Sequence, residues 1–140
     1  QTKNSKTNER VIYSMKVSLK RLKPNDVFKL RGTLDEDTAL KCYLTWPFTK
    51  KVAKEFILDY NTYGIWVNGG VLVGAVEVKE SLETAYFVSK NYRNLGIATK
   101  ALAECKKLFG KKQLWCVINP KNKASLKVAE KAKIRVSFVR

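Results

Sequence analysis

The chain has 140 residues, 45% of them hydrophobic, which is enough for one compact core and too short for two ordinary domains. Lysine and arginine number 28 against 12 acidic residues, and the resulting net charge of +16 favours an anionic partner. The absence of histidine excludes nucleophile systems that need an imidazole base.

The first residues differ in character from the rest. Residues 1–10 are polar and charged without periodicity, which predicts a flexible basic arm ahead of a single domain at 11–140. Within that domain, hydrophobic periodicity and turn residues predict a series of short elements. In chain order these are a strand at 13–22, a helix at 24–32, a helix at 49–60, a hairpin at 64–78, a strand at 83–89, a helix at 96–109, a strand at 113–118, a helix at 122–133 and a strand at 134–140.

Cap and turn residues mark several of these boundaries. Asn25 or Asp26 can cap the first helix, and Thr49 can cap the second. The run Asn68-Gly69-Gly70 supplies the positive φ angles that a tight hairpin turn requires. The strand, helix and strand over 83–118 form a βαβ unit, so their two strands are expected to be parallel neighbours in an α/β fold.

Cysteine usage and hydropathy narrow the class further. Cys42, Cys105 and Cys116 have no paired spacing, and this predicts neither a disulfide framework nor a metal site. No apolar run reaches the roughly 18 residues that cross a bilayer, and the start "QTKNSKTNER" lacks a signal-peptide core. These patterns predict a reduced, cytoplasmic protein without a membrane contact.

The stretch "SKNYRNLGIATKAL" at 89–102 joins a predicted strand to a predicted helix. If the helix begins just after Asn94, the amides of its first turn lack acceptors and carry the positive end of the helix dipole, which suits an anion. Gly96 allows a ligand close to the backbone, and Asn94 tolerates a left-handed conformation. The stretch lacks the glycine patterns of nucleotide and dinucleotide loops, and on spacing alone an ordinary strand-to-helix corner remains the alternative.

Two motifs in the second half resemble those of the GNAT acetyltransferase superfamily. "YRNLGIATKAL" resembles its acetyl-CoA loop, matched by Arg93, Gly96 and Ala98. "NKASLKVAEKAKI" is similar to its second motif, matched by Asn122 and Ser125. Upstream, "CYLTWPFTKKVAKEFI" resembles the ribosomal-protein N-terminal acetyltransferase branch. The resemblance implies an α/β (α+β) fold with a mixed central sheet of about six strands flanked by about four helices.

The resemblance also implies roles in an acetyl-CoA-dependent N-acetyltransferase. Phe87 and Val88 would pair with the pantetheine arm and offer an amide to the thioester oxygen, where acyl transfer builds negative charge. Asn122 and Ser125 would line the far side of the pantetheine channel, and Ser125 is a candidate acid for the leaving thiolate. The loop that would hold the CoA pyrophosphate comprises Arg93, Asn94, Leu95, Gly96, Ile97, Ala98 and Thr99.

An amine nucleophile must also lose a proton. An N-terminal amine has a pKa near 8 and is deprotonated by a weaker base than is a lysine side chain, whose pKa is near 10.4. Glu83 is the candidate base, because the resembling branch carries a glutamate three residues before the position of Tyr86 that acts through water. A solvated residue after a turn is the alternative reading of Glu83, and Glu77 is a second candidate base.

Some positions depart from the family pattern. The tyrosine that often serves the family as general acid would fall at Ala129, so that role is absent or passes to Ser125 or Tyr92. Asn94 stands where the loop usually has its first glycine. These departures leave a second interpretation open, in which a catalytically degenerate GNAT-fold module binds or builds a ribonucleoprotein or a virion.

Basic residues crowd the C-terminal third. Residues 35–92 carry six basic and eight acidic side chains, whereas 93–140 carry thirteen and two. Besides acetyl-CoA and a protein amine acceptor, this excess predicts contact with RNA or a ribonucleoprotein surface. A solvated lysine-rich face and a plain nucleic-acid-binding domain are the alternatives. The lysines concerned are Lys106, Lys107, Lys111, Lys112, Lys121, Lys123, Lys127, Lys131 and Lys133.

Overall fold

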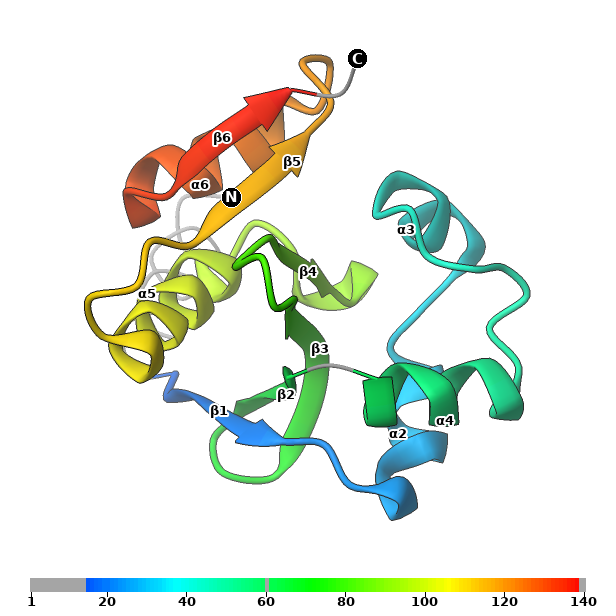
Figure 1. Ribbon diagram of the computed structural model, residues 1–140. Coiled ribbons are helices and arrows are strands. Elements are labelled where there is room, and N and C mark those ends of the chain that lie inside the picture. The colour runs from blue at the N-terminus through cyan, green and yellow to red at the C-terminus, as the bar shows by residue number, and fades with distance from the viewer. Residues whose placement is uncertain (1–14, 60, 139–140) are drawn as a thin grey trace, which may run out of the picture.

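The computed structural model describes residues 15–59 and 61–138, so the predicted arm at 1–10 and the last two residues of the predicted C-terminal strand lie outside the described residues. The described residues form strands, α-helices and two short 3₁₀ turns (Figure 1). In chain order the elements are β1 (Val17–Arg21), η1 (Pro24–Asp26), α2 (Val27–Gly32), α3 (Glu36–Lys41), α4 (Lys50–Asp59), β2 (Asn61–Val67), β3 (Val71–Val78), β4 (Thr84–Val88), η2 (Lys90–Tyr92), α5 (Ile97–Phe109), β5 (Trp115–Ile118), α6 (Lys123–Ala132) and β6 (Arg135–Phe138).

The six predicted strands are confirmed, and they divide into two groups. Strands β1 to β4 form an antiparallel sheet in chain order, and β5 pairs with β6 in parallel. A single parallel bridge joins Glu83, just before β4, to Trp115 at the start of β5. The two strands are therefore parallel neighbours at this bridge, as predicted, and they separate beyond it.

The β2–β3 hairpin turns where the sequence predicts. Asn68 and Gly69 have φ angles of 51° and 80°, the left-handed values that the turn needs. Further along, Ile65 pairs with Gly74 but Trp66 pairs with Leu72, so β3 carries one extra residue. Such a bulge bends a strand and increases its twist, and β3 is visibly curved (Figure 1).

Of the two predicted helix caps, only that of α4 is confirmed. Asp26 stands at the N-cap of α2 but forms no side-chain cap hydrogen bond there, because its carboxylate accepts from the Lys23 amide at 2.9 Å instead. The Thr49 hydroxyl accepts a hydrogen bond from the amide of Val52 at 3.2 Å, as predicted for α4. The described residues contain five α-helices rather than about four, because α3 is not predicted. Asp35 begins α3 by accepting from the Thr38 amide at 2.8 Å. Hydrogen bonding by the side chain and by the backbone amide of Thr38 lowers the pKa of Asp35. At six residues, α3 is too short to have a clear hydrophobic period.

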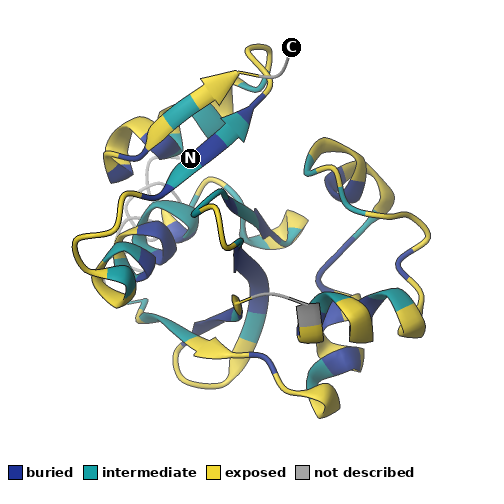
Figure 2. Ribbon diagram, in the orientation of Figure 1, coloured by how far each residue is buried: buried dark blue, intermediate teal, exposed yellow. Residues whose placement is uncertain are grey.

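The core lies on both faces of the four-stranded sheet. Helices α2 and α4 cover one face, packing Leu30, Ala53 and Phe87 together, and α5 covers the other. A third cluster joins α5 to α6, β5 and β6 through Leu102 and Ala129. Buried residues accordingly follow β3 and the inner side of α5, whereas β6 and the outer side of α6 are exposed (Figure 2). Among the described residues, no helix combines the length and apolar character of a membrane span.

Gly74 sets how closely β3 approaches β4. A Cβ atom at this position would overlap the carbonyl oxygen of Phe87, which belongs to the β4 backbone and cannot rotate away. We expect Gly74→Ala to lower the free energy of unfolding by about 1–3 kcal/mol, as overpacking does. Gly70→Ala is the matched control, since Gly70 has open space around it, and it should change stability by less than about 0.5 kcal/mol. Urea denaturation measures both, and equal stabilities would contradict the close approach.

Candidate active site

The connection from β4 to α5 contains two residues in the left-handed region. Asn94 has a φ of 62°, and Gly96, the N-cap of α5, has a φ of 77°. Asparagine and glycine are the residue types that adopt this conformation at least cost. The local sequence therefore produces a turn over residues 93–96, which joins η2 to α5.

The N-terminus of α5 has no side-chain cap. Thr49 caps α4, and the Asn122 side chain caps α6 by accepting from the Ser125 amide at 3.2 Å. Gly96 has no side chain to do the same, and no side-chain cap is formed at α5. Because the first amides of a helix have no acceptor within the helix, this terminus can bind an anionic group.

The hydrogen-bond partners of the β4 backbone explain why β4 and β5 separate. The Ser89 amide donates to the carbonyl oxygen of Val73 on β3. Because the backbone groups of successive residues in a strand point to opposite sides, those of Phe87 also point toward β3, and those of Tyr86 and Val88 point toward β5. The carbonyl oxygen of Val88 accepts from Arg93 Nε at 3.3 Å. The carbonyl oxygen of Tyr86 accepts from Cys42 Sγ at 3.5 Å. Beyond the bridge, therefore, these carbonyls do not pair with β5.

A pocket of about 610 Å³ opens between β4, α3, the start of α5 and α6. Its wall carries five cationic side chains, and no carboxylate is among the lining residues. Three of the cations are lysines spaced four apart on α6, on one side of that helix. The lining residues are Thr38, Lys41, Cys42, Tyr86, Phe87, Val88, Tyr92, Arg93, Asn94, Gly96, Ile97, Ala98, Thr99, Asn122, Lys123, Ala124, Ser125, Lys127, Val128 and Lys131.

Arg93 ties α3 to this loop. Its guanidinium donates to the hydroxyl of Thr38, which is buried on α3, as well as to the carbonyl oxygen of Val88. The same guanidinium contributes to the lowered pKa of Asp35 at the start of α3. Arg93 therefore holds α3 in position as one wall of the pocket.

Two neutral groups, the Tyr86 phenol from β4 and the Cys42 thiol just after α3, line the pocket. The Tyr86 hydroxyl donates to the carbonyl oxygen of Ser125 at 3.4 Å, and burial raises the pKa of Tyr86 to about 12. Burial also raises the pKa of Cys42 to about 11, so at neutral pH this thiol is not a thiolate nucleophile. The arrangement suits direct attack on a bound acyl group rather than transfer through cysteine.

All of the sequence-predicted site residues line the pocket except Leu95 and the two candidate bases, Glu83 and Glu77. Leu95 instead packs against the core beneath α5. Glu83 forms an ion pair with Lys79 at 3.5 Å beside the bridge to β5. The predicted residues that the pocket brings together are Phe87, Val88, Arg93, Asn94, Gly96, Ile97, Ala98, Thr99, Asn122 and Ser125.

The sequence prediction misses the wall that α3 and Tyr86 provide. Asp35 followed by Glu36 and Asp37 is a helix-start signal that could have located α3. Glu77 is buried on β3, in a small hollow that shares Cys42, Tyr86 and Phe87 with the main pocket. The second candidate base thus lies next to the pocket, on its β3 side.

The basic residues of the C-terminal third have several different uses. Lys123, Lys127 and Lys131 line the pocket. Lys106 donates to the carbonyl oxygens of Ala132 and Lys133, at 3.1 and 3.2 Å, and so satisfies the end of α6. The predicted basic face is therefore smaller than the lysine count suggests.

Comparisons with known proteins agree with this geometry. The family described as "Acetyltransferase (GNAT) domain" matches residues 16–135. The crystal structure of an acetyltransferase of the GNAT family from Bacillus anthracis is similar, with a TM-score of 0.68 and 21% sequence identity over 83% of this chain and 78% of that chain. At this identity the likeness concerns the fold, and no curated protein matches the chain. Since the family match covers most of the sequence, the chain belongs to the GNAT acetyltransferase family.

Proposed function

We propose that this protein transfers the acetyl group of acetyl-CoA to the amine of a protein acceptor. The observation that carries the proposal is the pocket at the uncapped start of α5, with five cationic side chains and no carboxylate in its wall. The co-substrate carries several phosphate charges, which favour helix amides and cations. The backbone amides of the loop from Asn94 to Thr99 and the α6 lysines would bind these phosphates.

The edge of β4 would activate the thioester. The backbone groups of Val88 face the pocket, since those of Phe87 face β3. A fixed amide aimed at the thioester oxygen stabilises the negative charge that develops there without reorganisation. Val88 is therefore the expected donor, and Phe87 contributes to the wall. Asn122 and Ser125 would contact the other side of the pantetheine arm from α6.

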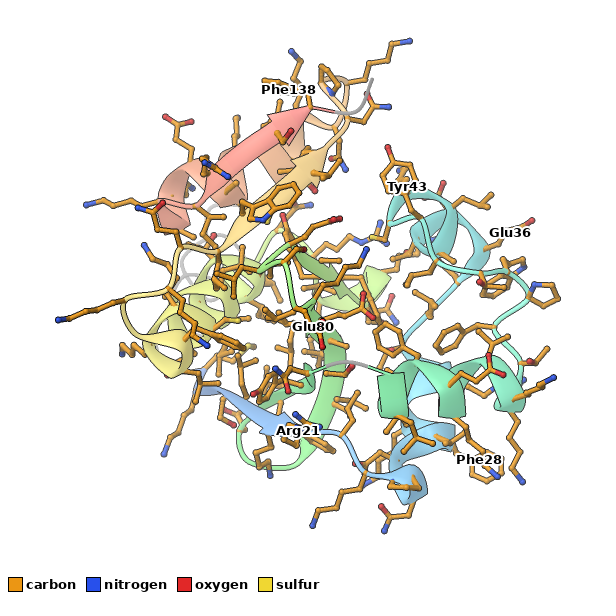
Figure 3. The ribbon with its side chains drawn as sticks, viewed as in Figure 1. Arg21, Phe28, Glu36, Tyr43, Glu80 and Phe138 are labelled. Atoms are coloured by element: carbon orange, nitrogen blue, oxygen red, sulfur yellow. The ribbon has the colours of Figure 1, made fainter. Side chains whose placement is uncertain are left out.

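The acceptor is expected to be a protein N-terminus. Residues 42–57, which resemble the ribosomal-protein N-terminal acetyltransferase branch, run from Cys42 in the pocket wall into α4. An N-terminal amine loses its proton more readily than a lysine, so a modest base suffices. A protein acceptor would enter from the side of α3, where Tyr43 is exposed at the helix end (Figure 3).

Two carboxylates are candidates for the base, and their positions differ. Glu83 is partly exposed and paired with Lys79, outside the pocket wall. Glu77 is buried in the hollow behind Cys42 and Tyr86. A base near the acyl group needs hydrogen-bond reach to the amine, directly or through one water. The position of Glu77 beside the pocket favours it for this role over Glu83, which lies outside the pocket wall.

An RNA or ribonucleoprotein contact is the second part of the proposal. Lys107, Lys111, Lys112 and Lys133 are exposed and lie where α5 and α6 end, outside the pocket. The Lys106 bonds to the end of α6 bring these two helix ends together. Within this cluster Lys107 pairs with Glu104 at 3.4 Å, and the remaining excess of positive charge suits a phosphate backbone, which would bring the acceptor to the pocket.

CoA binding tests the first part. Gly96→Val adds a side chain at a positive φ and crowds the anion site, and we expect it to weaken CoA binding at least about 100-fold, as loss of several charged hydrogen bonds would. Gly69→Val is the matched control, because Gly69 has a similar φ of 80° in the distant hairpin turn. Isothermal titration calorimetry measures both. The proposal fails if the wild-type protein does not bind CoA at millimolar concentration.

Kinetics distinguish the two carboxylates. We expect Glu77→Gln to lower kcat/KM for a peptide N-terminus by roughly 10², the low end for losing a general base, while CoA affinity is unchanged. Glu83→Gln preserves shape in the same way and should retain most of the rate. The opposite ranking would assign the base to Glu83, and two unchanged rates would mean that the amine arrives already deprotonated.

Charge reversal tests the RNA contact. Replacing Lys107, Lys111, Lys112 and Lys133 by glutamate should abolish binding to a generic RNA without changing CoA affinity, because none of the four lines the pocket. Wild-type affinity should fall with salt by about 0.7 to 0.9 in log–log slope for each phosphate neutralised. Fluorescence anisotropy measures both effects. If the wild-type protein binds no RNA at about 50 mM salt, the contact is refuted.

A further inference from the structure

The side chain of Tyr86 enters the pocket wall between β4 and α6. It packs against both the cluster beneath α5 and the cluster around Ala129, which is fully buried on α6. Alanine ends at Cβ, so α6 presents no long side chain at this point and leaves room for the phenol ring. A tyrosine from the strand thus occupies space beside the first two turns of α6.

The hydroxyl of Tyr86 donates a long, weak hydrogen bond. Its distance of 3.4 Å to the Ser125 carbonyl oxygen is well beyond the usual 2.7–2.8 Å for a hydroxyl donor. A bound acceptor in the pocket can therefore take this hydrogen bond at little cost.

Tyr86 lies close to the expected position of the thioester. Its side chain and that of Val88 share a face of β4, about 7 Å apart along the strand. The Val88 amide is the expected donor to the thioester oxygen, and the sulfur is bonded to the same carbon as that oxygen. The phenol and the amide can therefore contact the two electronegative atoms of one thioester.

We propose that the Tyr86 hydroxyl donates a hydrogen bond to the sulfur of CoA and stabilises the thiolate as it leaves. This inference rests on the proposed function. In the transfer, the carbon–nitrogen bond forms, the carbon–sulfur bond breaks with its electron pair on sulfur, and the carboxylate base takes the amine proton. The sulfur leaves as a thiolate held by the phenol and takes a proton from solvent on release.

The pKa values of the phenol and the thiol indicate that Tyr86 donates a hydrogen bond and does not transfer its proton. With a pKa of about 12, Tyr86 stays protonated at neutral pH and is always available as a donor. A thiol with an ordinary pKa near 8.5 is a stronger acid than this phenol, so Tyr86 keeps its proton when the thiolate forms. Its effect should therefore appear as a lowered pKa of the bound thiol.

The test compares the wild-type protein with Tyr86→Phe. We expect kcat/KM to fall about 10- to 100-fold, the range for a lost hydrogen bond to a charged group. The pKa of the thiol in bound CoA should rise by about one unit, which equals a tenfold change in affinity for the thiolate. Calorimetric titrations with CoA at several pH values give this pKa. Acetyl-CoA, which has no ionisable sulfur, is the reference ligand.

Tyr63→Phe is the matched control. Tyr63 contacts Phe109 edge to face outside the pocket, so this variant should leave the rate and the thiol pKa unchanged. Tyr86→Met, which also lacks the hydroxyl, serves if the phenylalanine variant does not fold. Unchanged rate and thiol pKa in a folded variant that binds acetyl-CoA overturn the role of Tyr86 alone. If the wild-type protein does not bind acetyl-CoA, the proposed function falls and this inference falls with it.

Discussion

The divergence of β4 from β5 is the constraint on which the rest of the site depends. A parallel ladder between these strands would use the backbone groups of Tyr86 and Val88, and no pocket would remain. Instead Cys42 and Arg93 donate to their carbonyl oxygens. Buried polar groups need partners, so these two bonds allow β4 to leave the ladder without the cost of unsatisfied carbonyls.

The same two bonds connect the walls of the pocket to each other. Cys42 follows α3 directly, and Arg93 also donates to Thr38 on α3. Strand, loop and helix are therefore fixed relative to one another before a ligand binds. Preorganisation of this kind reduces the ordering cost of binding and keeps donors in place for charge that develops during reaction.

Local signals in the sequence predict the elements well, because caps and turns depend on neighbouring residues. Thr49, Asn68 and Gly110 all act at the boundaries that their residue types indicate. The uncapped turn at Gly96 is predictable for the same reason. Its positive φ and uncapped helix follow from one glycine between a strand and a helix.

Contacts between distant segments could not be predicted in this way. The bond from Cys42 to Tyr86 joins residues far apart in sequence, and no local pattern encodes it. For the same reason the sequence places Glu83 and Glu77 on neighbouring strands but cannot tell which one adjoins the pocket. Hydrophobic period also assigns Tyr86 to a strand without indicating that its ring reaches α6.

The charged and the neutral side chains of the pocket come from different elements. The cationic side chains come from the loop and from helices α3 and α6, where Arg93 and the α6 lysines suit phosphate groups. Strand β4 and Cys42, which follows α3, contribute only neutral groups, and burial raises the pKa of both Cys42 and Tyr86. Each is uncharged in the folded state at pH 7, so the desolvated wall carries no buried charge.

This neutrality has a consequence for stability. Since the folded pKa values of about 11 and about 12 exceed the unfolded ones, folding binds protons at alkaline pH. The resulting stabilisation is fully present below the unfolded pKa values, 9.0 for Cys42 and 10.0 for Tyr86. It is lost as pH rises through the folded values. The walls formed by Tyr86 and Cys42 thus stay in one protonation state across the neutral range. The pH dependence of the rate should therefore come from the acceptor amine and the proposed carboxylate base.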